Sequence, residues 1–129
     1  MPHLTLEYTQ NLKVDHEFSD LLNKMHQCIA SIGAIKIENF KSRVYRAENF
    51  FIATGDENNG FVHLDVRFLE GRSQDVKQKI GEQMNQLLVD WFQPLNKALK
   101  LQITVEINDI KRAAYFKYPK GTLTQINSK

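Results

Sequence analysis

The alternation of apolar and polar positions predicts a strand, a helix and a second strand in the first half of the chain. Residues 3–8 alternate as in a half-buried strand. Between Phe18 and Ile32, apolar side chains recur at helical spacing up to Gly33, a residue that commonly ends helices. Residues 35–45 are typical of a second extended segment.

The same order returns in the second half. Residues 61–69 are strand-like, and Ser73 can cap a long helix whose apolar positions run from Val76 to Leu95. Residues 101–107 alternate again. Turn-forming residues cluster at 54–60, which predicts the join between the two halves.

The repeat is also visible in the residue letters. Residues 3–8 (HLTLEY) align with residues 63–68 (HLDVRF), and this alignment places Pro2 opposite Val62. Each helix is long enough to cross over between parallel strands, so we predict an α/β (α+β) fold with a four-stranded mixed sheet and two helices on one face. The length of 129 residues suits a single domain over 1–129, with units at about 1–57 and 58–115 and a C-terminal extension.

Two helices cover only one face of such a sheet. Association through the bare face or the sheet edges is therefore expected, and closed cyclic symmetry is the usual solution. A monomer of ferredoxin-like character, with a solvated second face, is the alternative.

Composition and charge narrow the classes of partner. Hydrophobic residues make up 42% of the chain, charged residues 25%, and the formal charge is +2, which does not indicate nucleic-acid or membrane binding. No export signal and no apolar run of about 18 residues is present, so we expect a cytoplasmic protein. The four histidines lack metal-ligand spacing, and we expect no metal and no cofactor.

Pro2 is the first candidate for chemistry. If Met1 is removed, the chain begins with a secondary amine whose lone pair is basic, held in one direction by the ring. An α-amino group titrates near pH 8, and nearby cations and an apolar pocket would lower its pKa toward neutrality, where a base can both take and give a proton. The alternative is that Pro2 only begins an edge strand.

Arginines supply candidate anion-binding groups. Arg72 precedes or begins the second helix, where the helix dipole disfavours a cation, so a purely structural role is less expected there. Arg43 and Lys41 lie two apart on a strand and share a face, which is also typical of a solvated basic stripe. Arginine matches a carboxylate with two parallel hydrogen bonds.

Several short motifs, taken in order along nearly the whole chain, resemble the 5-carboxymethyl-2-hydroxymuconate isomerase family of the tautomerase superfamily. They are Pro2-His3, Ser42-Arg43-Val44, Phe61-Val62-His63, Gly71-Arg72-Ser73, Gly81-Glu82 and Phe116-Lys117. The resemblance implies one catalytic proline per chain, because the second unit has Val62 at the matching place, and it implies a homotrimer. The family pattern has Arg-Ser-Arg where this chain has Lys41-Ser42-Arg43, and lysine keeps the charge but loses the two-bond geometry.

The resemblance implies a cofactor-independent isomerase that ketonises 5-carboxymethyl-2-hydroxymuconate, or a similar dienol polycarboxylate, in the breakdown of aromatic compounds such as homoprotocatechuate. Pro2 would carry the proton, Lys41, Arg43 and Arg72 would bind the substrate, and the Phe116 ring would line the pocket. Two alternatives stay open: a tautomerase of a phenylpyruvate-like keto acid, and a non-catalytic, ferredoxin-like module that binds a small anion.

Overall fold

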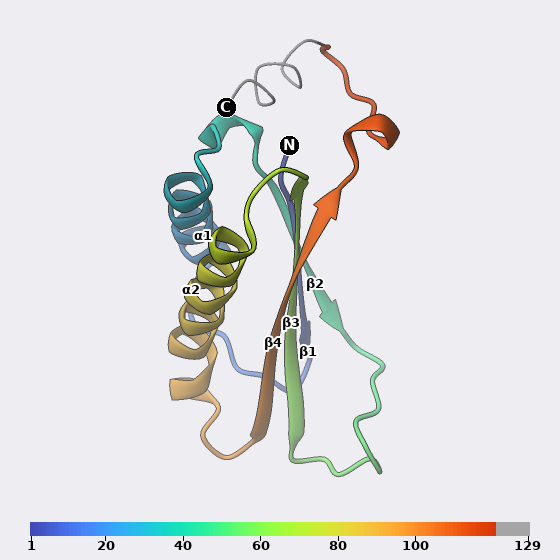
Figure 1. Cartoon of the computed structure of the whole chain (residues 1–129). Coiled ribbons are helices and arrows are strands. Elements are labelled where there is room, and N and C mark those ends of the chain that lie inside the picture. The colour runs from blue at the N-terminus through green and yellow to red at the C-terminus, as the bar shows by residue number, and fades with distance from the viewer. Residues whose placement is uncertain (121–129) are drawn as a thin grey trace.

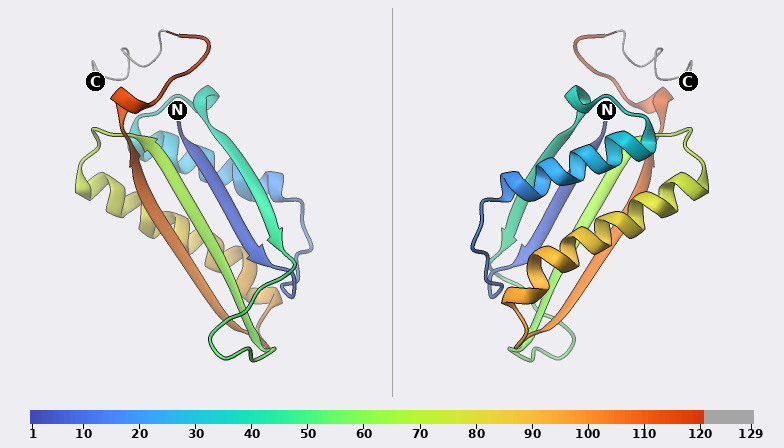
Figure 2. Two further views of the ribbon diagram at one scale, coloured as in Figure 1. Left: turned by 90° about the vertical axis from the view of Figure 1, so that its right-hand side faces the viewer. Right: turned by 90° about the vertical axis from the view of Figure 1, so that its left-hand side faces the viewer.

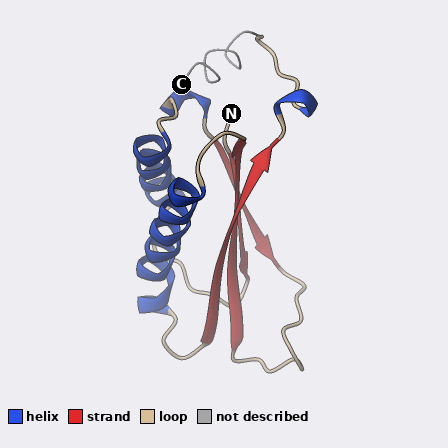
Figure 3. Cartoon of the chain, in the orientation of Figure 1, coloured by secondary structure: helices blue, strands red, loops and turns tan. Residues whose placement is uncertain are grey.

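Strands and helices alternate in the order β-α-β-β-α-β in the computed structural model, which describes residues 1–120 (Figures 1 and 3). Residues 121–129, part of the predicted C-terminal extension, lie outside this range. The strands are β1 (His3–Thr9), β2 (Lys41–Ala47), β3 (Asn59–Leu69) and β4 (Lys100–Ile110). The helices are α1 (Phe18–Gly33) and α2 (Gln74–Phe92), with short 3-10 turns η1 (Ile37–Asn39), η2 (Gln93–Leu95) and η3 (Arg112–Ala114).

The strands form one four-stranded sheet in the order β2-β1-β3-β4. β1 pairs parallel with β2, β3 pairs parallel with β4, and the two central strands pair antiparallel. Both helices pack on the same face of the sheet (Figure 2). The predicted mixed sheet with two helices on one face is confirmed.

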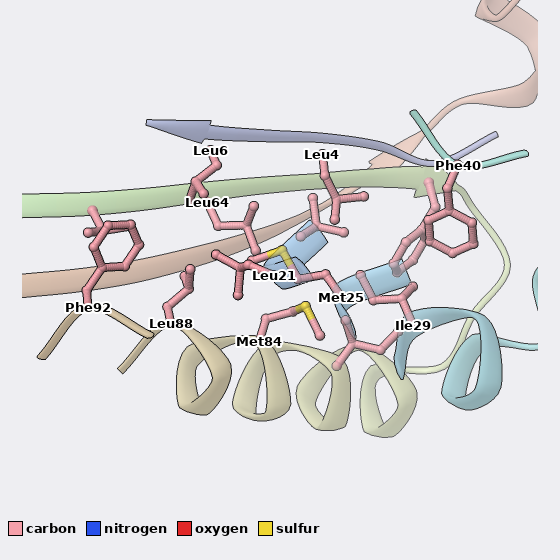
Figure 4. Close-up of a cluster of buried hydrophobic side chains, with 14 of the residues drawn as sticks. Leu4, Leu6, Leu21, Met25, Ile29, Phe40, Leu64, Met84, Leu88 and Phe92 are labelled. Atoms are coloured by element: carbon pink, nitrogen blue, oxygen red, sulfur yellow. The ribbon is translucent and has the colours of Figure 1, made fainter. Parts of the chain in front are cut away.

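The core lies between the helices and the sheet. Alternate residues of the central strands point inward and meet apolar side chains spaced three or four apart on each helix, as the two periodicities require. Burial of a leucine-sized side chain contributes about 1.5–3 kcal/mol, so this layer supplies most of the driving force for folding. Figure 4 shows the centre of this cluster: Leu4, Leu6, Leu21, Met25, Ile29, Leu64, Met84, Leu88 and Phe92.

The helices end close to the predicted positions. α1 ends at Gly33, but the left-handed residue that closes it is Ala34, with φ of 52°. A Cβ at Gly33 would lie 3.2 Å from Ile35 Cδ1, a tight contact that this side chain would have to relieve by a small shift. Ser73 caps α2 as predicted, since its hydroxyl accepts a hydrogen bond from the Val76 N–H at 3.2 Å. In the described chain, neither helix has the length and apolar character needed to cross a bilayer.

The predicted strand over residues 35–45 is wrong in its first half. The chain makes the turn η1 at Ile37–Asn39, and β2 begins only at Lys41. Ile35 and Phe40 turn toward the core, with Phe40 stacked 4.9 Å from the His26 ring. Alternating apolar letters in this segment therefore reflect a connection that packs against α1, not a strand.

The face of the sheet opposite the helices is polar. It presents side chains that pair with one another across the strands, such as His63 Nδ1 with Thr104 Oγ1 at 2.7 Å and Asn108 with Asp65. His3 and His63 both lie on this face, so neither is explained by packing in the core. A polar surface of this kind can face water or an aqueous channel.

Candidate active site at the amino terminus

The topology brings four segments to the amino terminus. β1 begins beside the start of β2, with His3 opposite Lys41, and beside the end of β3, with His3 opposite Arg67. β4 ends beside β3, with Ile110 opposite Leu69. The loop from β3 to α2 and the segment after β4 therefore lie at the same end of the molecule as Met1 (Figure 1).

Pro2 is buried at this end, and its carbonyl accepts a hydrogen bond from the Lys41 N–H at 3.0 Å. Met1 precedes it, so the Pro2 nitrogen is an amide and has no basic lone pair. Met1 itself is only 2% exposed, and its Sδ lies 3.4 Å from Lys117 Nζ. The amino group present in this arrangement is that of Met1.

The surroundings make the protonated form of this amino group a stronger acid than an ordinary α-ammonium group. Burial first, and then the positive charges of Arg72, Lys41, Lys117 and Arg112, lower its pKa from 8.0 to about 5. Each effect disfavours the ammonium form, because the charge loses hydration and meets like charges. An amino group held here is therefore uncharged at pH 7, and its lone pair can accept a proton.

Arg72 is fixed by two backbone carbonyls. Its Nε donates to Gly33 O at 3.1 Å and its Nη1 to Leu69 O at 3.4 Å, while the guanidinium lies 5.8 Å from the centre of the Phe68 ring. Nη2 has no hydrogen bond within residues 1–120. Burial and the charge of Arg112 lower the pKa of this guanidinium, which nonetheless stays protonated as arginine does in proteins. Arg72 thus ties the end of α1 to the loop that precedes α2.

Lys41 and Arg43 lie on the same face of β2, but their side chains act on different groups. Lys41 is exposed and acts on the amino terminus. Arg43 instead reaches His3, with Nη1 at 3.3 Å and Nη2 at 3.4 Å from His3 Nδ1. On the other side of that ring, Nε2 lies 2.8 Å from the Tyr115 hydroxyl. These three residues line a hollow of about 550 Å³ on the open face of the sheet.

His3 connects the two groups of cations. Its pKa is lowered by burial, and then by the charges of Arg43, Lys41, the amino terminus and Arg67. Charges from both places thus act on His3, which lines the open-face hollow and lies next to the amino terminus.

Phe116 is exposed in the single chain. It follows η3 and is 89% exposed. The predicted pocket roles of Pro2, Lys41, Arg43, Arg72 and Phe116 stay predictions. Within residues 1–120, no cluster of three or more His, Cys, Asp or Glu side chains could hold a metal ion.

Sequence reasoning missed the contribution of Arg112 and Tyr115. Both belong to the segment after β4, where Phe116 is the residue that the sequence predicts for the site. Their proximity to the amino terminus follows only from strand order, because the end of β4 lies beside the end of β3 and so near the start of β1. A fully worked topology could have indicated them.

Known proteins resemble this chain over nearly its whole length. A 5-carboxymethyl-2-hydroxymuconate isomerase from Deinococcus radiodurans R1 is 30% identical, with a TM-score of 0.82 over 92% of this chain and 90% of its own. The 5-carboxymethyl-2-hydroxymuconate Delta-isomerase of Escherichia coli is 26% identical over 117 residues, 91% of this chain and 93% of that protein. A fused 4-OT protein, solved as a symmetric trimer, shares the fold at 15% identity, with a TM-score of 0.69 over 92% and 94% of the two chains.

The family pattern described as 5-carboxymethyl-2-hydroxymuconate isomerase matches residues 2–120. This range includes every predicted site residue. The predicted enzyme class, an isomerase of the tautomerase type, is confirmed, and a non-catalytic binding module is set aside. The chain belongs to the 5-carboxymethyl-2-hydroxymuconate isomerase family.

Proposed function

We propose that the chain, once Met1 is removed, ketonises 5-carboxymethyl-2-hydroxymuconate or a closely similar dienol polycarboxylate. One observation carries the proposal: an amino group at this end of β1 is buried among Arg72, Lys41, Lys117 and Arg112, and burial first, then these charges, lower its pKa to about 5. Removal of Met1 would transfer the amino group to Pro2, which lies one residue closer to the strand and next to the same charges.

In the proposed step, the neutral Pro2 nitrogen takes the proton of the 2-hydroxyl group. The O–H electron pair forms the carbonyl bond, the double bonds shift along the conjugated chain, and the far carbon takes the proton back from Pro2. The amine ends neutral, as it began, so one residue serves as base and then as acid. A lowered pKa suits this exchange, because an ammonium of ordinary pKa would be mostly protonated at pH 7.

The cations fix the substrate. Arg72 offers its Nη2, and Lys41 offers its exposed ammonium, to the carboxylates nearest the amine. Arg43 would hold another carboxylate or the keto oxygen at the edge of the hollow beside His3. Lysine at position 41 gives a looser contact than arginine would, which leaves room for a substrate that differs from the family's own.

We also propose that the chain works as a homotrimer in the cytoplasm. The fused 4-OT protein of the same fold is a symmetric trimer, which supports the assembly. An assembly of this kind would bring the exposed Phe116 of one subunit near the site of its neighbour, where its ring could exclude water from the amine. A role in the breakdown of aromatic compounds follows from the proposed substrate.

The test compares Pro2→Ala with Pro94→Ala, which changes a proline in η2 at the far end of the molecule. Mass spectrometry first establishes that Met1 is absent from all three proteins. Pro2→Ala leaves a primary amine of poorer placement, so kcat for the muconate enol should fall about 10²- to 10⁴-fold. Pro94→Ala should retain wild-type kcat.

Equal turnover by wild type and Pro2→Ala would contradict the mechanism. The substrate is tested separately, by comparing kcat/KM for the muconate enol and for the enol of phenylpyruvate. A higher value for phenylpyruvate would assign the chain to a different tautomerase reaction while leaving the role of Pro2 intact.

A further inference from the structure

A second guanidinium lies beside the loop that carries Arg72. Arg112 begins η3, two residues after the end of β4, and its Nη2 donates to Glu70 O at 2.7 Å. Its backbone N–H donates to Glu70 Oε2 at 2.9 Å. Arg72 Nη1 donates to Leu69 O, so the two guanidiniums hold consecutive carbonyls of one loop.

The loop is shaped to admit this side chain. Gly71 adopts φ of 125°, a conformation that favours glycine, and a Cβ at this position would lie 3.3 Å from Arg112 Nη2. The guanidinium therefore rests directly against the Gly71 backbone, one residue before Arg72.

Arg112 donates hydrogen bonds to the loop, but one nitrogen of its guanidinium has no hydrogen-bond partner among the described residues. Its Nη1 is buried and has no hydrogen-bond partner among residues 1–120. A buried charged donor left without a partner is costly, so an acceptor is expected at this place. Met1 is buried among these same cations, and its removal would make the space that it fills available to a ligand.

The charges at this end are also unbalanced. Neither Arg72, Arg112 nor Lys41 forms an ion pair with a carboxylate in the described part of the chain. Glu70 is the nearby acid, and it accepts from the Arg112 backbone N–H. An anion with several carboxylates would balance these cations and supply the missing acceptor.

We infer that Arg112 is a specificity-determining residue of the amino-terminal site, where its Nη1 binds an additional carboxylate of a tricarboxylate ligand. The inference rests on the proposed function for the identity of the substrate, but the binding of carboxylates can be measured without turnover. A purely structural clamp, which only ties η3 to the loop, would not distinguish ligands by their number of carboxylates.

Two inert probes differ by the one group of interest. Tricarballylate is glutarate with a third carboxylate on its central carbon, and calorimetry gives a dissociation constant for each on the processed chain. Wild type should bind tricarballylate about tenfold or more tightly than glutarate, as expected for one hydrogen-bonded charge pair. Arg112→Gln should reduce that ratio to near one while leaving the affinity for glutarate largely unchanged.

Arg46→Gln is the matched control. It makes the same chemical change at an exposed residue on β2, beside Glu48 and away from the amino terminus, and should keep the wild-type ratio. Arg112→Lys keeps the charge but loses the planar fork, so its ratio should be intermediate. This variant also serves if Arg112→Gln does not fold.

An unchanged ratio in Arg112→Gln and Arg112→Lys, or an equal loss of affinity for both probes, would overturn the inference. The proposed function is judged independently by the Pro2→Ala kinetics. A ratio that depends on Arg112 in a chain without isomerase activity would retain the anion site and reject the function. Isomerase activity that depends on Pro2, together with a ratio that does not depend on Arg112, would retain the proposed function and reject the anion site.

Discussion

Arg72 has five N–H donors, which are divided between a structural role and the proposed binding of substrate. Nε and Nη1 hold Gly33 O and Leu69 O, which places a cation at the C-terminal end of α1, where the helix dipole favours it. Nη2 is the nitrogen that we propose binds the substrate. The expectation that a structural role was less plausible, drawn from the start of α2, overlooked the end of α1 because that contact joins residues 39 positions apart.

The pH dependence of catalysis should reveal the charge of Arg72. A positive charge beside an amine disfavours the ammonium form, so Arg72→Gln should raise the pKa of the Pro2 amine. In wild type, the acid limb of the kcat/KM profile should lie below pH 8, the usual pKa of an α-amino group being about 8. In the variant, this limb should move to higher pH. At pH values below this limb, kcat/KM should fall in the variant, whereas its value on the plateau at high pH should change less.

Arg46→Gln is again the control, because this exposed residue should leave the limb in place. A limb that stays fixed in Arg72→Gln, or moves to lower pH, would contradict the proposed environment of Pro2. Titration of ¹⁵N-labelled Pro2 by NMR gives the same pKa without turnover and separates it from any effect on substrate binding.

Among single residues, the sequence identified those whose position follows from a motif. Pro2 and Arg72 were named because one follows Met1 and the other lies in the Gly71-Arg72-Ser73 loop. The direction of Arg43 could not be predicted, because alternation on a strand gives the face of the sheet and not the neighbour that a long side chain selects. Its choice of His3 depends on the adjacent strand.

At the scale of elements, the capping of α2 also positions the site. The Ser73 hydroxyl accepts from the Val76 N–H, which fixes the first turn of the helix directly after Arg72. Ser73→Ala should lower the free energy of unfolding by about 1 kcal/mol, the usual effect of losing such a cap. Denaturant unfolding measures this value, and KM should rise as the loop loosens.

Ser19→Ala provides the comparison. Ser19 is an exposed residue in the first turn of α1, without a side-chain hydrogen bond within the described residues, and its replacement should change stability by less than about 0.5 kcal/mol. Equal stability of Ser73→Ala and Ser19→Ala would show that the cap contributes nothing.

Both helices were predictable because their apolar positions keep helical spacing over many turns, whereas the segment from Ile35 to Phe40 was not. Its letters alternate as in a strand, yet Ile35 and Phe40 are turned inward by η1 and by the left-handed Ala34 that ends α1. A short connection that packs against a helix carries too few residues for its period to distinguish it from a strand.

For the whole molecule, strand order is what assembles the site. The antiparallel pairing of β1 with β3 brings the loop before α2 and the segment after β4 to the amino terminus, although they lie about 70 and 110 residues further along the chain. The division into units 1–57 and 58–115 stays a prediction, but its consequence for Val62 is visible: this residue is buried inside β3 and has no free amino group.

A mixed-subunit experiment tests whether the site is shared between chains of the proposed trimer. Phe116 is 89% exposed in the single chain, so we expect its proposed role in the pocket to involve a neighbouring subunit. Phe116→Ala should then lower kcat/KM several-fold, because water reaches the amine and raises its pKa, while the helical and strand content is unchanged. Light scattering of wild type should give three times the chain mass of 15.0 kDa.

Pro2→Ala and Phe116→Ala chains are then unfolded together and refolded as a mixture. If each site combines Pro2 of one subunit with Phe116 of the next, a cyclic mixed trimer contains about one site with both native residues, and activity should exceed the mean of the two parents. Pro2→Ala mixed with Pro2→Ala, Phe116→Ala double variants is the control and should show no gain. Because a gain requires two chains to complete one site, activity that stays at the parental mean would contradict a site shared between subunits.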